Sequence, residues 1–86
     1  MKTYYEHWRE QQEAGLKTYH IADDTGWRTL RAFDVDDAAR EYARLERIKS
    51  IERLDDLADH VEGVGGWLTL HEDGDLLYST NEGFSR

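Results

Sequence analysis

Eight carboxylates lie between Leu54 and Ser85, a segment of 32 residues that contains no lysine or arginine. They are Asp55, Asp56, Asp59, Glu62, Glu72, Asp73, Asp75 and Glu82. The remaining 54 residues contain eleven acids and eleven bases, so the whole formal net charge of −8 comes from this segment. Charge separated in this way produces a directional electric field, which acts on binding partners more than on the fold. We predict that the eight residues form an acidic partner-binding surface.

The first half of the acidic segment has the pattern of a helix with two different sides. Asp55, Asp59 and Glu62 follow one another at spacings of four and three residues, which places them on one side of an α-helix. The apolar residues of the stretch fall on another side: Leu54, Leu57, Ala58 and Val61. Two interpretations are open for the acidic side. It is either a recognition surface or an ordinary solvated face that keeps the protein soluble.

Other chemistry finds little support in the sequence. The four histidines lie in four different predicted elements, without the spacing of a helical metal site: His7, His20, His60 and His71. The run from Glu72 to Asp75 lacks most ligands of a calcium-binding loop. There is no cysteine, and no serine has the glycine-flanked setting of an activated nucleophile. We expect no enzyme activity, metal or cofactor, although acid–base work by a carboxylate pair stays open.

Length and composition predict one small domain over residues 1–86. The chain has no proline and no glycine- or serine-rich linker, and 38% of its residues are apolar. Without cysteine, the core must be stabilised by packing alone, and we expect the ten aromatic residues, including Trp8, Trp27 and Trp67, to supply large buried areas. No stretch is apolar enough to span a bilayer or serve as a signal peptide. The chain should be soluble and cytoplasmic.

The first part of the chain predicts a helix followed by a β-hairpin. Thr3 and Glu6 have the spacing of a capping box, and Gly15 suits the end of a helix over residues 4–14. Residues 16–22 and 27–33 contain aromatic and β-branched side chains, and the Asp- and Gly-containing sequence between them favours a turn. A second helix should begin after Asp34, a good N-cap residue.

The remainder predicts two more helices and a second hairpin. Apolar positions before and after Lys49 do not lie on one stripe, so we expect helices over 35–48 and 51–62 with a break near Ser50; residues 47–54 could instead form a strand. Strands 67–70 and 76–79 flank a turn that contains Asp73 and Gly74. The predicted fold class is α+β, in the order α-ββ-αα-ββ, with helices on one face of an antiparallel sheet of about four strands.

At the level of class, a small acidic α+β domain with charge of one sign on one face resembles phage-encoded inhibitors of host nucleic-acid machinery, among them anti-CRISPR proteins. The resemblance implies a protein partner with a basic surface, such as a CRISPR effector complex in the host cytoplasm. The eight carboxylates would dock there in place of nucleic-acid phosphate. A net charge of −8 also disfavours direct binding to nucleic acid or to anionic membranes.

An alternative function is an accessory or homodimeric interaction domain. Its contact would be an apolar patch made by Tyr4, Tyr5 and Trp8, or by Ile48 and Ile51, and the charge would serve solubility. The two functions differ in their response to salt, since an acidic docking surface weakens as ionic strength rises and an apolar one does not.

Overall fold

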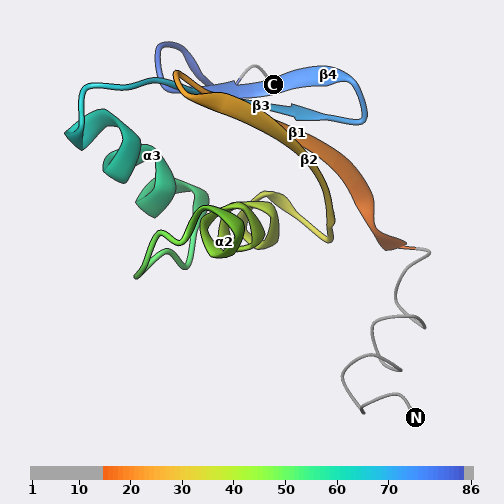
Figure 1. The fold of residues 1–86 in the computed structure, drawn as a ribbon. Coiled ribbons are helices and arrows are strands. Elements are labelled where there is room, and N and C mark those ends of the chain that lie inside the picture. Colours follow the sequence, from red (N-terminus) through yellow and green to blue (C-terminus); the bar gives the residue numbers. More distant parts are fainter. Residues whose placement is uncertain (1–14, 85–86) are drawn as a thin grey trace, which may run out of the picture.

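The computed structural model describes residues 15–84, so the predicted helix over residues 4–14 lies outside the described residues. The described elements are, in chain order, β1 (Lys17–Asp23), β2 (Gly26–Ala32), α2 (Val35–Glu46), α3 (Leu54–Gly63), β3 (Leu68–Glu72), β4 (Asp75–Ser79) and β5 (Gly83–Phe84). They form one antiparallel sheet in the order β2-β1-β3-β4-β5, with both helices on the same side (Figure 1). The α+β class is confirmed. The sheet has five strands instead of four, and the described order is ββααβββ.

Both predicted hairpins are present, each with a turn that its local sequence explains. In the β1–β2 turn, the Asp23 carboxylate accepts hydrogen bonds from the backbone N–H groups of Thr25 (2.8 Å) and Gly26 (3.1 Å). In the β3–β4 turn, Asp73 and Gly74 have positive φ angles of 50° and 93°. Asp-Gly tolerates this left-handed backbone, which matches the twist of the flanking strands.

The fifth strand was not predicted from the sequence. Residues Gly83 and Phe84 pair with Ser79 and Tyr78 at the edge of the sheet, and a strand of two residues has no detectable periodicity. The register between β3 and β4 shifts next to Leu70, so that Leu77 and Tyr78, although adjacent in sequence, both pack against the core. A β-bulge of this kind turns consecutive side chains toward the same face.

The break between the two helices is confirmed, and it is longer than expected. The Asp34 carboxylate caps α2 by accepting from the backbone N–H of Asp37 at 2.8 Å. The helix ends at Glu46, and Arg47 and Ser50 then adopt left-handed φ angles of 60° and 67°. Residues 47–53 are neither helix nor strand, because Ile48 and Ile51 turn inward and pack against the core instead of continuing a helical stripe.

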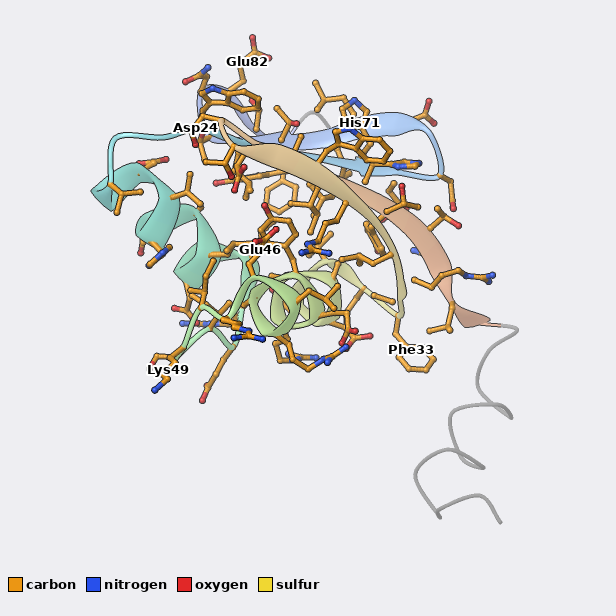
Figure 2. All side chains as sticks on the ribbon, in the orientation of Figure 1. Asp24, Phe33, Glu46, Lys49, His71 and Glu82 are labelled. Atoms are coloured by element: carbon orange, nitrogen blue, oxygen red, sulfur yellow. The ribbon has the colours of Figure 1, made fainter. Side chains whose placement is uncertain are left out.

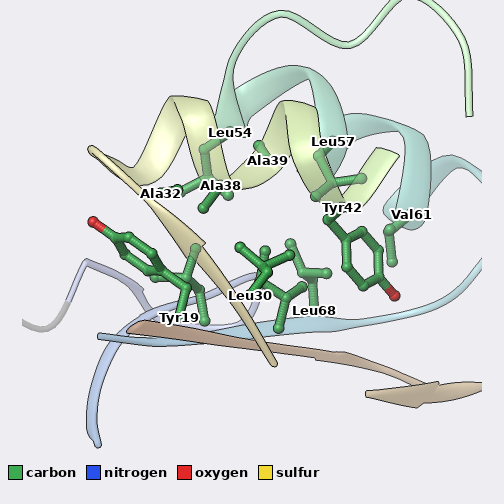
Figure 3. Packing of buried hydrophobic residues seen from close by; sticks show 12 residues of the cluster. Tyr19, Leu30, Ala32, Ala38, Ala39, Tyr42, Leu54, Leu57, Val61 and Leu68 are labelled. Atoms are coloured by element: carbon green, nitrogen blue, oxygen red, sulfur yellow. The ribbon is translucent and has the colours of Figure 1, made fainter. Parts of the chain in front are cut away.

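The core lies between the helices and the sheet (Figure 3). The strands contribute Tyr19, Ile21, Leu30, Ala32, Leu68 and Leu70, and the helices contribute Ala38, Ala39, Tyr42, Leu54, Leu57 and Val61. The expectation that tryptophans fill this core is wrong for two of them, since Trp27 is 71% exposed and Trp67 is 43% exposed. Trp8 lies outside the described residues. Trp27 lies outside the core because the register of β2 on β1 pairs it with Ala22, on the sheet face away from the helices. Trp67 lies outside the core because it precedes β3.

Two tyrosines connect this core to carboxylates at opposite ends of the sheet. Tyr42 is buried, and its hydroxyl donates a partly buried hydrogen bond to Asp23 at 2.7 Å, beside the β1–β2 turn. Tyr19 is also buried, and its hydroxyl donates a partly buried hydrogen bond to Glu72 at 3.0 Å, beside the β3–β4 turn. Each carboxylate thus accepts the hydrogen bond of a tyrosine hydroxyl, a polar group that would otherwise lack a partner where its ring is buried. The pKa values of both tyrosines are raised, first by burial and then by the carboxylate that accepts the bond.

Candidate partner-binding surface

Helix α3 presents a row of three exposed carboxylates, here called the α3 stripe: Asp55, Asp59 and Glu62. The helix is anchored by Leu54, Leu57, Ala58 and Val61, each at most 4% exposed. No side chain of the stripe forms a hydrogen bond or an ion pair with the residues that the structure describes. The stripe therefore directs uncompensated negative charge toward solvent from a fixed helix.

The start of α3 is held in place by groups from α2 and by its own first turn. The backbone N–H of Leu54 donates to Asp36 of α2 at 2.9 Å, and the Arg40 guanidinium donates to the carbonyl of Glu52 at 2.8 Å. Through the bond from Leu54, Asp36 satisfies one of the N–H groups that have no intrahelical partner at the start of a helix. These contacts give the stripe a defined position relative to the rest of the fold.

Asp56 belongs to the same helix, but its carboxylate serves the fold. It accepts from the backbone N–H groups of Glu52 and Arg53 at 3.0 and 3.1 Å. These two hydrogen bonds hold the pKa of Asp56 below its usual range, because they favour the charged carboxylate. The sequence placed Asp56 beside the acidic row, and the structure makes it a helix-capping residue.

An aromatic pair that the sequence did not single out joins strands β4 and β5. The rings of Tyr78 and Phe84 are tilted against each other with centroids 4.9 Å apart, and Phe84 is 52% exposed. Burial raises the pKa of Tyr78, and the negative charges of Glu62, Asp55 and Asp59 raise it further. The Tyr78 hydroxyl therefore lies within the field of the stripe. No local signal could have found this pair, because Phe84 reaches Tyr78 only through the two-residue strand β5.

The carboxylates of the β3–β4 turn are mostly engaged within the fold. Glu72 accepts from Tyr19 and lies 3.5 Å from the Lys17 ammonium. Asp73 accepts from the backbone N–H of Thr18 at 3.1 Å and returns its own N–H to the Thr18 carbonyl at 2.8 Å. Asp75 is exposed at the start of β4. Two of these three predicted binding residues thus join β3 to β1.

Glu82 occupies a third place, in the connection from β4 to β5. Its side chain is exposed at the end of the sheet opposite the β3–β4 turn, where the nearby Thr80 N–H donates to the carbonyl of Leu68 at 3.0 Å (Figure 2). A strand of five residues such as β3 extends over about 16 Å. The eight predicted residues therefore occupy α3, the β3–β4 turn and the β4–β5 connection, and they do not form one continuous row.

The sheet face away from the helices brings together two histidines that are distant in sequence. His20 of β1 and His71 of β3 are direct cross-strand neighbours, and His20 Nδ1 lies 2.8 Å from the Thr29 hydroxyl oxygen of β2. Figure 2 shows His71 on this face. Across residues 15–84, no three His, Cys, Asp or Glu side chains come together in a way that could hold a metal ion.

Comparisons with protein-family models, with curated proteins and with solved structures find no match to this chain. Within the described range, neither helix has the length and apolar character needed to cross a membrane.

Proposed function

We propose that this protein binds a basic surface of a larger protein and inhibits it by occupying the place of nucleic acid. The observation that carries the proposal is the α3 stripe, whose three carboxylates are exposed, fixed on a buried helix and unpaired within residues 15–84. The partner class is a nucleic-acid-binding complex, with a CRISPR effector complex as the specific example.

Folding leaves the negative charge of the stripe without a countercharge among residues 15–84. Like charges at helical spacings of three and four residues cost a few tenths of a kcal/mol per pair, and α3 itself contains no lysine or arginine to offset this cost. A groove of arginine and lysine that normally holds phosphates would supply the missing countercharge. Complementary charge of this kind accelerates association and fixes orientation more than it adds affinity.

The proposed surface has a second chemical component beside its charge. Tyr78 lies within the electric field of the stripe and contacts the exposed ring of Phe84, and aromatic residues are enriched at protein interfaces. Arginine side chains, abundant in phosphate-binding grooves, bind both carboxylates and aromatic faces. The proposed binding surface consists of Asp55, Asp59, Glu62, Tyr78 and Phe84.

The apolar-patch alternative has lost one of its two candidate contacts. Ile48 and Ile51 are partly buried against the core, so they do not form an exposed ridge. The other candidate patch, Tyr4, Tyr5 and Trp8, lies outside the described residues. Acidic docking therefore has the better support from the described part of the chain.

The test compares two triple charge reversals that change net charge equally. The first converts the stripe (Asp55→Lys, Asp59→Lys and Glu62→Lys), and the second converts three exposed carboxylates that do not share one surface (Asp24→Lys, Glu52→Lys and Asp75→Lys). Each protein is titrated against a purified, guide-loaded CRISPR effector complex, with binding of labelled target DNA as the readout at two salt concentrations. Circular dichroism checks that each variant is folded.

We expect the parent to reduce DNA binding, with an effect that weakens as salt increases. The stripe variant should lose at least about tenfold in inhibition, and the matched variant should lose much less, because placement of the charge matters more than its amount. Equal inhibition by the parent and a folded stripe variant would show that the stripe only solvates the helix.

A further inference from the structure

We infer that one end of the sheet is a second binding surface, which takes an arginine side chain from an extended segment of another protein. We call this surface the tryptophan end and define it by Trp27, Trp67, Asp24 and Glu82, all of them exposed. Trp27 is the more open of the two tryptophans, at 71% exposed against 43% for Trp67. The inference goes beyond the proposed inhibition and does not depend on the α3 stripe.

Pairing along β1 brings the two tryptophans to the same end of the sheet. Asp23, the last residue of β1, pairs with Gly26 of β2 on one side and with Leu68 of β3 on the other. Trp27 directly follows Gly26, and Trp67 directly precedes Leu68. The two tryptophans therefore flank the end of β1, although they are 40 residues apart in sequence.

The two carboxylates lie at the same end as the tryptophans. The Asp24 carboxylate packs against the backbone at Gly66, where an added Cβ would lie 2.6 Å from Oδ1 of Asp24. The connection that carries Glu82 is bonded to the start of β3, because the Thr80 N–H donates to the carbonyl of Leu68 at 3.0 Å. Figure 2 shows Asp24 and Glu82 at this end of the sheet. Three connections that are distant in sequence thus meet here.

The tryptophan end carries negative charge without a countercharge. Residues 18–27 and 54–84 contain no lysine or arginine. The side chains of Asp24 and Glu82 form no hydrogen bond or ion pair with the described part of the chain. Arg28, the next cation along the chain, is already bonded to a glutamate of α2 at 2.8 Å. A countercharge for these two carboxylates therefore has to come from a partner.

Exposed indoles beside unpaired carboxylates favour arginine over an apolar occupant. An apolar side chain would cover the indoles, but it would also remove water from the carboxylates without replacing it. A guanidinium stacks on an aromatic face and donates hydrogen bonds to a carboxylate, and tryptophan is the best aromatic partner for a cation. Charge complementarity thus identifies the occupant.

The spacing of the tryptophans indicates an extended segment. Trp27 and Trp67 belong to connections of β2 and β3, which are separated by β1, and strands two places apart in a sheet are about 10 Å from each other. An extended chain covers that distance in about three residues. One arginine and its neighbours in a partner segment can therefore reach both rings.

The experiment uses a blocked peptide with one arginine between glycines as the probe. It is titrated into the full, isotope-labelled chain, and the readout is the NMR signal of the indole N–H groups of Trp27 and Trp67, assigned through Trp27→Phe and Trp67→Phe. We expect both signals to shift in a saturable way that weakens as salt increases. Peptides with citrulline or leucine in place of arginine should bind at least about threefold more weakly, because they lack the positive charge.

Two glycine variants test the position of the Asp24 carboxylate without changing the charge. Gly66→Ala displaces this carboxylate, whereas Gly63→Ala is the matched control, since nothing lies within 4 Å of an added Cβ there. Gly66→Ala also approaches Val61 at 3.2 Å, so Asp24→Asn repeats the test without altering the packing. Gly66→Ala and Asp24→Asn should each raise the dissociation constant at least about threefold, and Gly63→Ala should leave it unchanged.

The two triple charge reversals described for the proposed function separate the two surfaces. The stripe variant should keep the indole shifts, and the matched variant, which contains Asp24→Lys, should lose them while it keeps most of its inhibition. Equal binding of the arginine and leucine peptides would assign the tryptophans to an apolar partner and overturn the inference. The absence of indole shifts would overturn it as well, as would parental affinity in folded Asp24→Asn.

Discussion

The α3 stripe and the β3–β4 turn are equally acidic in sequence but differ in what their carboxylates do. On α3, Asp55, Asp59 and Glu62 have no side-chain hydrogen bond or ion pair with residues 15–84. In the turn, Glu72 and Asp73 bond to β1. A carboxylate that already accepts hydrogen bonds from the fold has less capacity to attract a partner, and removing it affects stability. The number of carboxylates in a segment therefore locates an acidic region, whereas tertiary pairing decides which of the charges remain available to a partner.

The largest expected effect comes from removing the support of the stripe. Leu57 is fully buried beneath α3, so Leu57→Ala should lower the free energy of unfolding by about 2–5 kcal/mol through lost burial and a residual cavity. Urea denaturation followed by circular dichroism measures this change. The control is Asp59→Ala on the exposed side of the same helix, expected within about 0.5 kcal/mol of the parent. Similar losses in both variants would contradict the two-sided description of α3.

The next effect separates the two acidic regions directly. Glu72→Ala should cost about 1–3 kcal/mol, because it leaves the partly buried Tyr19 hydroxyl without its acceptor. Glu62→Ala should be neutral or slightly stabilising, since it relieves repulsion along the stripe. A double-mutant cycle with Tyr19→Phe isolates the hydrogen bond, and Glu72→Ala should cost less in that background. An equal cost in both backgrounds would mean that Glu72 acts through something other than Tyr19.

The smallest effect is a change in the titration of Tyr78. Burial and the charges of Glu62, Asp55 and Asp59 raise its pKa, so Glu62→Lys should lower that pKa toward the ordinary value for tyrosine. A raised pKa contributes stability below the unfolded value, about 10, and this contribution is lost as pH rises through the folded value. The alkaline loss of stability due to Tyr78 should therefore shrink in Glu62→Lys. Spectrophotometric titration, with Tyr78→Phe identifying the signal, measures the change; an unaltered titration would place Tyr78 outside the field of the stripe.

The features that depend on residues close together in the chain were predictable from the sequence. Asp34 caps α2, and the Asp73-Gly74 pair makes a turn, because both effects act within four residues along the chain. The break between the helices followed from two apolar stripes that do not share one side. The α3 stripe itself was predictable from spacing, since helical geometry alone brings Asp55, Asp59 and Glu62 together.

The remaining features depend on pairing between distant segments. The role of Glu72 is set by Tyr19, 53 residues earlier, and the exposure of Trp27 is set by the register of β2 on β1. The strand β5 is too short to have a sequence pattern, so its contact between Phe84 and Tyr78 was not foreseen. Ile48 and Ile51 satisfied a helical spacing, yet burial in the connection between the helices determined their conformation instead.

The pairing of β1 with β3 also has a consequence for the order in which the chain can fold. Each hairpin closes over a few residues, and such local contacts form quickly. The central β1–β3 ladder requires the intervening β2, α2 and α3 to be enclosed in one long loop, and closing that loop costs entropy before any packing compensates for it. During synthesis, β1 is made long before β3 leaves the ribosome. Strand β1, the second in the sheet order, therefore has no β3 to pair with during this interval. The native core can form only when the two hairpins join.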